Sequence, residues 1–358
     1  MEERTLRLTP PFGGTLFLSL LLLVILLVAG EFLTRTDRVE SHFISASRGS
    51  PHFQFELQLG RLERMAAIEG SIDCIFLGNS MVGNGFDPIA FSRAYSDETG
   101  FDLRCFNFGI DALPVTGASG LAQYLIKEYQ PKLLIYGADA RDFTVGREDW
   151  DAKVILDIPW MNYQLGTFSV QGWLYEYSQF YRYARTFGYL LMLDKQYLFI
   201  KEPDRMTGED LGFYAKDTVG SFVSTSPALN MEMAPVRYYF QMLSNFKILP
   251  ENTSSLEDLL NNGKEGLAVA VVVMPVPETY HEFFSINSQG YQIFLDHLQA
   301  TTSKFGSTIW IPPENSISED GWADYTHLNT RGAAAFSMWL GKQIGESVLT
   351  DQVSLLNR

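Results

Sequence analysis

The chain has 358 residues, of which 46% are hydrophobic and 14% aromatic, and its formal net charge is −15 with a sequence pI near 4.8. Such a chain can bury a large core, which excludes a disordered or low-complexity protein and suggests one large domain or one domain with an insertion. The acidic balance and the lack of a basic stripe argue against a nucleic-acid partner, because binding to phosphates needs clustered Lys and Arg.

An uncharged apolar run extends from Thr15 to Gly30 near the N-terminus. With its apolar neighbours it approaches the ~20 residues that cross a bilayer. Its length favours a membrane signal-anchor over a cleaved signal peptide, although Val28-Ala-Gly30 offers the small residues that a signal peptidase accepts. The flanking arginines do not select an orientation, but a single N-terminal span most often acts as an export signal. We therefore expect a single-pass membrane protein whose remaining residues lie on the extracytoplasmic side.

The sequence divides into four parts by composition. We assign residues 1–34 to an N-terminal tail and anchor, 35–70 to a polar juxtamembrane segment, 71–348 to an α/β domain and 349–358 to a tail. Short apolar runs predict buried strands at Cys74–Leu77, Leu103–Phe108, Leu133–Tyr136, Leu267–Met274 and Thr308–Ile311. Helical patterns lie near Pro88–Tyr95, Gly120–Tyr129, Ser288–Ser303 and Thr330–Ile344. This alternation predicts a three-layer α/β sandwich around a parallel sheet of about five strands.

Residues 143–266 interrupt the alternation and are rich in aromatic residues, most clearly from Trp173 to Tyr183. The patterns at Gly172–Leu193 and Pro235–Ile248 predict that this insertion is largely helical. An insertion after the third strand would rise from the carboxyl edge of the sheet, where it could form a lid or a docking surface. The alternative, to which we give more weight, is that the aromatic residues pack the insertion's own core.

Cys74 and Cys105 are the only two cysteines, and each lies in a predicted buried strand. Their spacing fits no metal site, so we expect buried thiols and no metal. We also expect no cofactor. If the two strands are neighbours in the sheet, a disulfide bridge is an alternative that an exported location permits.

The segment Asp73-Cys-Ile-Phe-Leu-Gly-Asn-Ser80 reads as a buried strand that stops at a glycine and presents a hydroxyl group. Ligands and catalytic groups of open α/β sheets lie at the carboxyl ends of the strands. We therefore expect Cys74–Leu77 to be an interior strand with Ser80 at its carboxyl end. The alternative is that Gly78, Asn79 and Ser80 only form a turn, since all three residue types favour turns.

A second informative segment, Asp324-Tyr-Thr-His327-Leu-Asn-Thr, precedes the last predicted helix. An Asp three residues before a His can accept the imidazole Nδ1–H while Nε2 faces outward, which is half of a Ser-His-Asp triad. Asn329 or Thr330 can cap the helix and fix the loop. A lone D-x-x-H is also compatible with a surface histidine and a capping aspartate.

The combination of these segments resembles the SGNH, or GDSL-like, hydrolase superfamily of serine esterases and acyltransferases. Leu77-Gly-Asn-Ser80 matches the first block, with Asn79 where many members have Asp, and Asp324 and His327 match the last block. Asn107-Phe-Gly109 matches the second block. The resemblance implies that Ser80 is the nucleophile, His327 the general base and Asp324 its orienting acid. It also implies an oxyanion hole formed by the backbone N–H groups of Ser80 and Gly109.

One block departs from the family's pattern. Where the family has Gly-x-Asn-Asp after the third strand, this chain has Gly137-Ala-Asp139-Ala140-Arg141-Asp142. An ionised Asp139 aimed at an oxyanion would repel the charge that develops there. Either Asp139 points elsewhere, or Asn84 or Arg141 replaces the missing amide as a donor.

This departure makes the chain similar to the membrane-anchored envelope branch of the superfamily, which includes the DltD family and the alginate acetylation proteins. The resemblance implies an exported serine esterase or O-acyltransferase that acts on an envelope polysaccharide or related glycan, with a membrane-bound O-acyltransferase as a partner. The alternative is a non-catalytic scaffold that docks such an acyltransferase or a glycan. The presence of Ser80, Asp324 and His327 together favours the enzyme, since a scaffold needs none of them.

Overall fold

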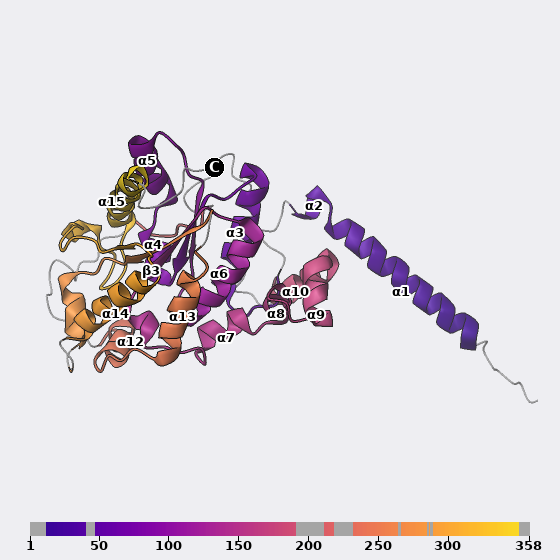
Figure 1. Ribbon diagram of the computed structural model, residues 1–358. Helices are drawn as coiled ribbons and strands as arrows, with labels where there is room; N and C mark the ends of the chain where they lie inside the picture. Colours follow the sequence, from indigo (N-terminus) through magenta and orange to yellow (C-terminus); the bar gives the residue numbers. More distant parts are fainter. Residues whose placement is uncertain are drawn as a thin grey trace, which may run out of the picture.

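The structure is a computed structural model that describes residues 12–40, 47–190, 211–217, 232–263, 266–284, 286 and 289–350. Much of the predicted insertion and most of the predicted C-terminal tail lie outside these residues. The described part combines an α/β core with one long N-terminal helix that projects from it (Figure 1).

A five-stranded parallel sheet forms the centre of the core. Its strands are β1 (Cys74–Gly78), β2 (Cys105–Gly109), β3 (Leu133–Ala138), β4 (Ala268–Val273) and β5 (Ile309–Trp310). The order is β2-β1-β3-β4-β5, so β1 lies inside the sheet between β2 and β3. The predicted α/β class, the five parallel strands and the interior position of β1 are therefore confirmed.

Helices cover both faces of the sheet. Alternate residues of each strand point to opposite faces, so a strand that is covered on both sides is apolar throughout. Ile75 and Leu77 of β1 join one buried cluster with α3 (Phe53–Glu69), α6 (Val115–Tyr129) and α13 (Pro250–Leu260). Cys74 and Phe76 join a second cluster with α5 (Pro88–Thr99) and α15 (Thr330–Leu349). Every residue of β1 is thus buried, which explains its uninterrupted apolar sequence.

The remaining helices extend the core or follow the insertion. They are α1 (Phe12–Thr34), α2 (Asp37–Glu40), α4 (Ser80–Gly85), α7 (Trp150–Leu156), α8 (Pro159–Gln164), α9 (Val170–Tyr177), α10 (Gln179–Leu190), α12 (Ala234–Leu243) and α14 (Gly290–Lys304). Short 3-10 turns occupy Ala140–Phe143, Glu278–Phe284 and Glu319–Gly321. The prediction that the insertion is largely helical is confirmed for residues 143–190 and 232–263, whereas its described residues 211–217 form no helix.

Two sequence assignments need correction at the level of elements. The pattern at Gly172–Leu193 is not one helix, because the chain turns at Ser178 between α9 and α10. The segment at residues 35–70 is not only a polar connection, because α3 occupies its second half and buries Phe55 and Leu59 in the core. The globular core therefore begins earlier in the chain than the sequence indicates.

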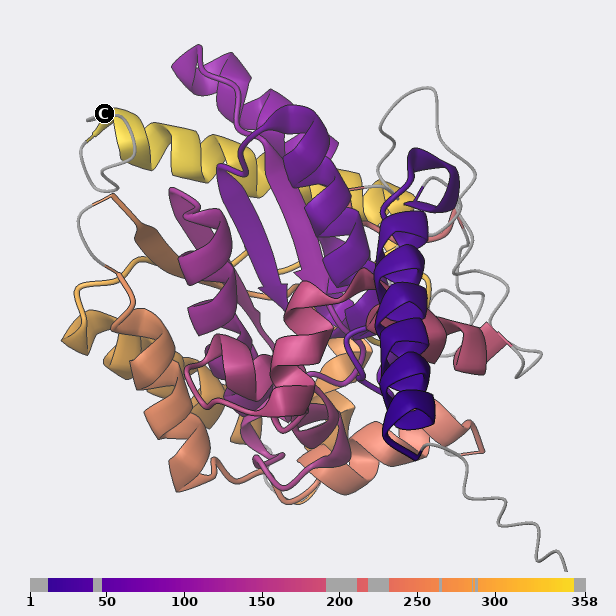
Figure 2. The same ribbon diagram turned by 90° about the vertical axis from the view of Figure 1, so that its right-hand side faces the viewer.

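The N-terminal helix α1 stands apart from the core. Within Gly14–Thr34, an 18-residue window has a mean hydropathy of 2.8, and none of that window is buried within the molecule. The helix is long and apolar enough to cross a membrane. Figure 2 shows it beside the helices that follow α8, which it contacts through α10.

Cys74 and Cys105 lie opposite each other in the register of β1 and β2, and both are buried free thiols. The expectation of reduced thiols is confirmed, and the alternative of a disulfide bridge is not realised. Burial raises the pKa of the Cys74 thiol well above its usual range, which keeps it protonated and unreactive.

Candidate active site

Ser80 lies where the interior strand β1 passes into helix α4, at the carboxyl edge of the sheet. A Cβ atom on Gly78 would come within 2.8 Å of the Gly137 carbonyl oxygen, so a glycine is required for this close turn. Asn79 caps α4, since its side-chain oxygen accepts the Met81 N–H at 2.7 Å. Ser80 is therefore the first helical residue, and its side chain is only partly buried.

His327 is held by a compact loop between Gly321 and α15. The loop is closed by an antiparallel bridge between Trp322 and Leu328, and the Ala323 N–H donates to the His327 carbonyl at 2.9 Å. Asn329 caps α15, as predicted, because its side-chain oxygen accepts two backbone N–H groups of the first turn at 3.0 and 3.1 Å. Its amide also donates to the loop, which ties the loop to the helix.

Ser80, His327 and Asp324 converge although Ser80 and His327 are 247 positions apart. The Ser80 Oγ lies 2.8 Å from His327 Nε2. On the other side of the ring, His327 Nδ1 lies 2.7 and 2.9 Å from the two carboxylate oxygens of Asp324. Asp324 is fixed in turn by the backbone N–H groups of Thr326 and His327, at 2.9 and 2.7 Å. A base within reach of a hydroxyl, and an acid that orients the base, can together activate the hydroxyl as a nucleophile.

The Asp324 carboxylate and a protonated His327 imidazole stabilise each other. Burial disfavours protonation of the His327 imidazole, but the hydrogen bond and the charge of Asp324 outweigh it, so the pKa of His327 lies above its usual value. Burial acts in the opposite sense on Asp324, and the bonds from His327 and the backbone keep its pKa below the usual value. Asp324 thus remains ionised and can stabilise an imidazolium at His327.

Of the two oxyanion donors that the resemblance implies, one is engaged elsewhere. The Gly109 N–H donates to the Asn107 side-chain oxygen at 2.9 Å, so this group is already engaged and the assignment to Gly109 is not supported. Within the described residues the other implied donor, the Ser80 N–H, has no acceptor. Ala112 follows β2 and has φ 59°, a conformation that costs a non-glycine residue about 1–2 kcal/mol. Such local strain recurs at functional sites.

Asn84 and Arg141, the two alternative donors, both have other partners. The Asn84 amide donates to the Ser80 carbonyl at 2.8 Å, within α4. The buried Arg141 guanidinium donates to the Ala112 carbonyl at 3.0 Å and to the Tyr238 hydroxyl at 2.8 Å. Arg141 therefore holds the strained Ala112 peptide in place instead of pointing its charge at an oxyanion.

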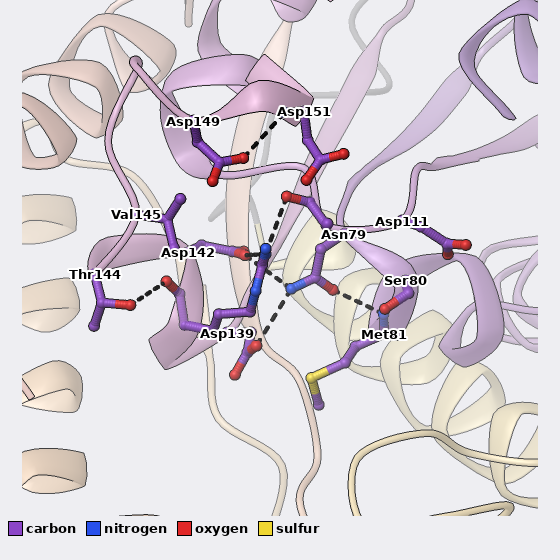
Figure 3. A network of polar contacts seen from close by, with 12 residues as sticks. Asn79, Ser80, Met81, Asp111, Asp139, Asp142, Thr144, Val145, Asp149 and Asp151 are labelled. Carbon is purple, nitrogen blue, oxygen red and sulfur yellow. Dashed lines mark hydrogen bonds and ion pairs between the residues drawn. The ribbon is translucent and has the colours of Figure 1, made fainter. Parts of the chain in front are cut away.

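A buried polar network lies behind the nucleophile, centred on Asn79 (Figure 3). The Asn79 amide donates to Asp142 at 2.8 Å and to Asp139 at 3.3 Å. The Tyr280 hydroxyl donates to the other oxygen of Asp139, and the Tyr136 hydroxyl donates to Asp142 at 3.0 Å. Asp139 thus accepts hydrogen bonds from Asn79 and Tyr280, and these partners hold its carboxylate in the buried network. This arrangement fits the first alternative from the sequence, that Asp139 points elsewhere than at an oxyanion.

The two carboxyl groups of this network are too close and too buried to ionise together easily. Burial, and then the charge of Asp139, raises the pKa of Asp142 to about 8. Burial also raises the pKa of Asp139 above its usual value. At neutral pH the pair therefore retains a proton, and the charge near Ser80 is smaller than the sequence suggests.

A short segment of the insertion, residues 211–217, crosses the site. The Tyr214 N–H donates to the Gly83 carbonyl at 3.2 Å, and the Tyr214 hydroxyl donates to Asp111 at 3.0 Å. The Thr330 N–H donates to the Lys216 carbonyl at 3.2 Å. These bonds join the helix of Ser80, the loop after β2 and the start of α15, which directly follows the His327 loop, so this part of the insertion contacts all three sides of the site.

Sequence reasoning found Ser80, Asp324 and His327 but missed Asn79 and Asp142 as a buried pair. The signal for them was the Asp139-Ala-Arg-Asp142 sequence directly after β3, at the same sheet edge as Ser80. Within the described residues, no group of three or more His, Cys, Asp or Glu side chains is arranged to hold a metal ion.

Comparisons with known proteins found no family model, no curated protein and no solved structure that matches this chain. The assignment of function therefore rests on the site itself.

Proposed function

We propose that this chain is a membrane-anchored, exported serine esterase or O-acyltransferase that acts on an envelope polysaccharide or related glycan through an acyl-enzyme intermediate. The observation that supports the proposal most strongly is the 2.8 Å contact between Ser80 Oγ and His327 Nε2, with Asp324 on the other imidazole nitrogen. Turn chemistry or helix capping alone does not require this convergence. The SGNH-like, three-layer arrangement belongs to the same proposal.

The chemistry follows from the positions of these groups. His327 Nε2 removes the Ser80 hydroxyl proton as Oγ attacks the acyl carbonyl, and the negative charge on the carbonyl oxygen is stabilised by the N–H group of Ser80. The imidazolium, paired with Asp324, then returns the proton to the leaving alcohol as the tetrahedral intermediate collapses to the acyl-enzyme. Water or a sugar hydroxyl then attacks the acyl carbonyl as His327 accepts its proton, and His327 returns this proton to Ser80 Oγ as the acyl group leaves.

The glycan substrate and the acyltransferase partner are the less direct parts of the proposal. The apolar helix α1 supports them, because an anchor of this kind would keep the site close to the membrane surface at which envelope polymers are assembled. The helix α1 also supports the extracytoplasmic side, since a single N-terminal span most often directs export.

A fluorophosphonate probe on the purified full-length chain tests the catalytic part. We expect labelling of the wild type, and loss of labelling in Ser80→Ala and in His327→Ala. Ser71→Ala is the matched control, because Ser71 is exposed at the opposite end of β1 and should leave labelling unchanged. A folded wild type that resists the probe, or labelling that survives Ser80→Ala, would favour the non-catalytic scaffold instead.

A further inference from the structure

The end of the apolar helix α1 is joined firmly to the start of α10. The Glu31 carboxylate accepts the Ser178 hydroxyl at 2.8 Å and the backbone N–H groups of Gln179 and Phe180 at 2.9 and 3.1 Å. The two N–H groups belong to the first turn of α10 and have no acceptor within the helix, and a negative charge is stabilising at a helix N-terminus. Arg35 adds a bond to the Tyr177 carbonyl at 2.9 Å. The junction is therefore a specific contact and not a loose tether.

Close packing strengthens this junction. A Cβ atom on Gly30 would lie 2.6 Å from the ring of Phe180, so the ring rests directly on the helix backbone at the place where α1 leaves its apolar stretch. Helices α9 and α10 are consequently held beside the C-terminal end of α1, as both ribbon views show (Figures 1 and 2). Any membrane that α1 crosses would have its surface near α9.

At this position the chain exposes an apolar patch. We use the name aromatic patch for Leu165, Phe168, Val170, Trp173 and Tyr177, whose exposed fractions are 40, 72, 65, 45 and 55%. The spacing of Val170, Trp173 and Tyr177 places them on one face of α9. The opposite face is buried through Gly172 and Tyr175. The patch is thus an ordered helix face and not a collection of scattered side chains.

The patch contains almost no charge. Between residues 165 and 180 the only charged side chain is Glu176. Its carboxylate accepts the Trp160 indole N–H at 2.9 Å, which turns it toward the protein. The other carboxylate beside the patch, Glu31, is paired with Arg35 at 2.7 Å. Exposed apolar side chains on a protein with a net charge of −15 are therefore concentrated next to the apolar helix α1.

We infer that the aromatic patch lies in the lipid headgroup region of the membrane that α1 crosses, with Trp173 and Tyr177 as interfacial anchors. This inference rests on the membrane anchorage in the proposed function. Trp and Tyr side chains favour the membrane–water boundary because they combine an apolar ring with a polar group, and a helix with one apolar face lies in that boundary. The aromatic residues of this segment thus fall into two groups. Tyr175 and Tyr183 are buried in the protein, and the residues of the aromatic patch lie in the lipid headgroup region.

Two attachments have a consequence that one anchor lacks. A single helix allows the globular part to swing, whereas α1 and the aromatic patch together fix its tilt on the bilayer. The site would then face a constant direction and height above the lipid surface, which suits a substrate that is itself held at the membrane.

Site-directed spin labelling of the full-length chain in phospholipid nanodiscs tests the inference. Single nitroxide labels are placed through Trp173→Cys, Leu21→Cys in α1 and Ile89→Cys on α5, and Val170→Cys gives a second label in the patch. Cys74 and Cys105 are at most 2% exposed, so they should not react in the folded chain, which the wild type checks. Collision rates with oxygen, which concentrates in lipid, and with a water-soluble nickel complex are then compared.

We expect the labels at 21, 170 and 173 to collide at least several-fold more often with oxygen than with the nickel complex, and the label at 89 to show the reverse. Water-like values at 170 and 173 with lipid-like values at 21 would overturn the inference but leave the anchor intact. Water-like values at 21 as well would overturn the anchorage on which it rests. Protection of 170 and 173 from both reagents would mean that protein covers the patch, which also overturns the inference.

Discussion

At the scale of single residues, the relay from Asp324 to His327 makes a prediction about pH. His327 must be neutral to accept the Ser80 proton, and its pKa lies above the usual value for histidine. We expect kcat/KM for a soluble ester to fall on the acid side with a midpoint above about 6.5, the usual histidine pKa. In Asp324→Asn the midpoint should move to lower pH, and the rate should fall on the order of ten-thousandfold. A wild-type midpoint below that of Asp324→Asn would contradict the assignment of the base.

The buried carboxyl pair makes a separate prediction about stability. Asp142 has a pKa of about 8 in the folded chain, so folding binds a proton between the unfolded pKa near 4 and pH 8. The folded state therefore loses up to about 1.4 kcal/mol per pH unit in this window as the pH rises. Asp142→Asn should remove this slope, so that the stability of the variant relative to wild type improves from pH 5 to pH 8. Urea unfolding at several pH values measures the unfolding free energy of both proteins. If this free energy depends on pH in the same way in wild type and in Asp142→Asn, the carboxyl pair carries no extra proton.

Individual residues also show how far a sequence can specify a site. The convergence of Ser80, Asp324 and His327 was predicted because their two segments together resemble a known superfamily, whereas neither segment alone requires it. The bond between Asn79 and Asp142 was not, because nothing in a sequence tells which way a buried carboxylate turns after a strand ends. The engagement of the Gly109 N–H by Asn107 depends in the same way on a side-chain rotamer that only the packed structure fixes.

At the scale of elements, the cap of α15 links stability to the position of His327. Asn329→Ala removes a buried helix cap and should cost about 1–2 kcal/mol of unfolding free energy. Asp87→Ala removes the equivalent cap of α5 and should cost about 1 kcal/mol, without touching the site. We expect kcat/KM to fall at least tenfold in Asn329→Ala and to stay near wild type in Asp87→Ala. Equal activity of the two variants, measured well below their unfolding temperatures, would mean that the cap does not position His327.

The helices and strands were predictable where the burial of apolar residues alone determines them. The strands were found because each is buried on both faces and reads as an apolar run, and α5 and α15 were found from their periodicity. The break between α9 and α10 was missed because its cause is distant in sequence. The start of α10 is stabilised by Glu31, which is 147 positions from Ser178. Helix α3 was missed as a core element because its charged residues made residues 35–70 look polar, although one of them, Glu56, is itself buried.

At the scale of the whole molecule, the structure has two apolar systems that do not merge. One is the core on both faces of the sheet, and the other is α1 with the exposed face of α9. The sequence predicted the first system and the apolar helix, because each is a continuous pattern along the chain. The placement of α9 beside α1 depends on the contact of Glu31 with the start of α10, which no local pattern reveals.

This contact should control the orientation of the globular part relative to α1. Glu31→Ala removes the acceptor of three hydrogen bonds at the start of α10, so the angle between α1 and the core should become variable. Electron–electron distance measurements between nitroxide labels at Leu21→Cys and Ile89→Cys, in nanodiscs, should give a narrow distribution in the parent chain and a clearly broader one with Glu31→Ala. Arg38→Ala is the control, because Arg38 is exposed just beyond α1 and has no hydrogen bond or ion pair in the described part of the chain. Hydrolysis of a soluble ester should be unchanged in both variants, since Glu31 contacts no residue of the site. If the distribution stays narrow without Glu31, the packing of Phe180 on Gly30 is sufficient to hold the two parts together.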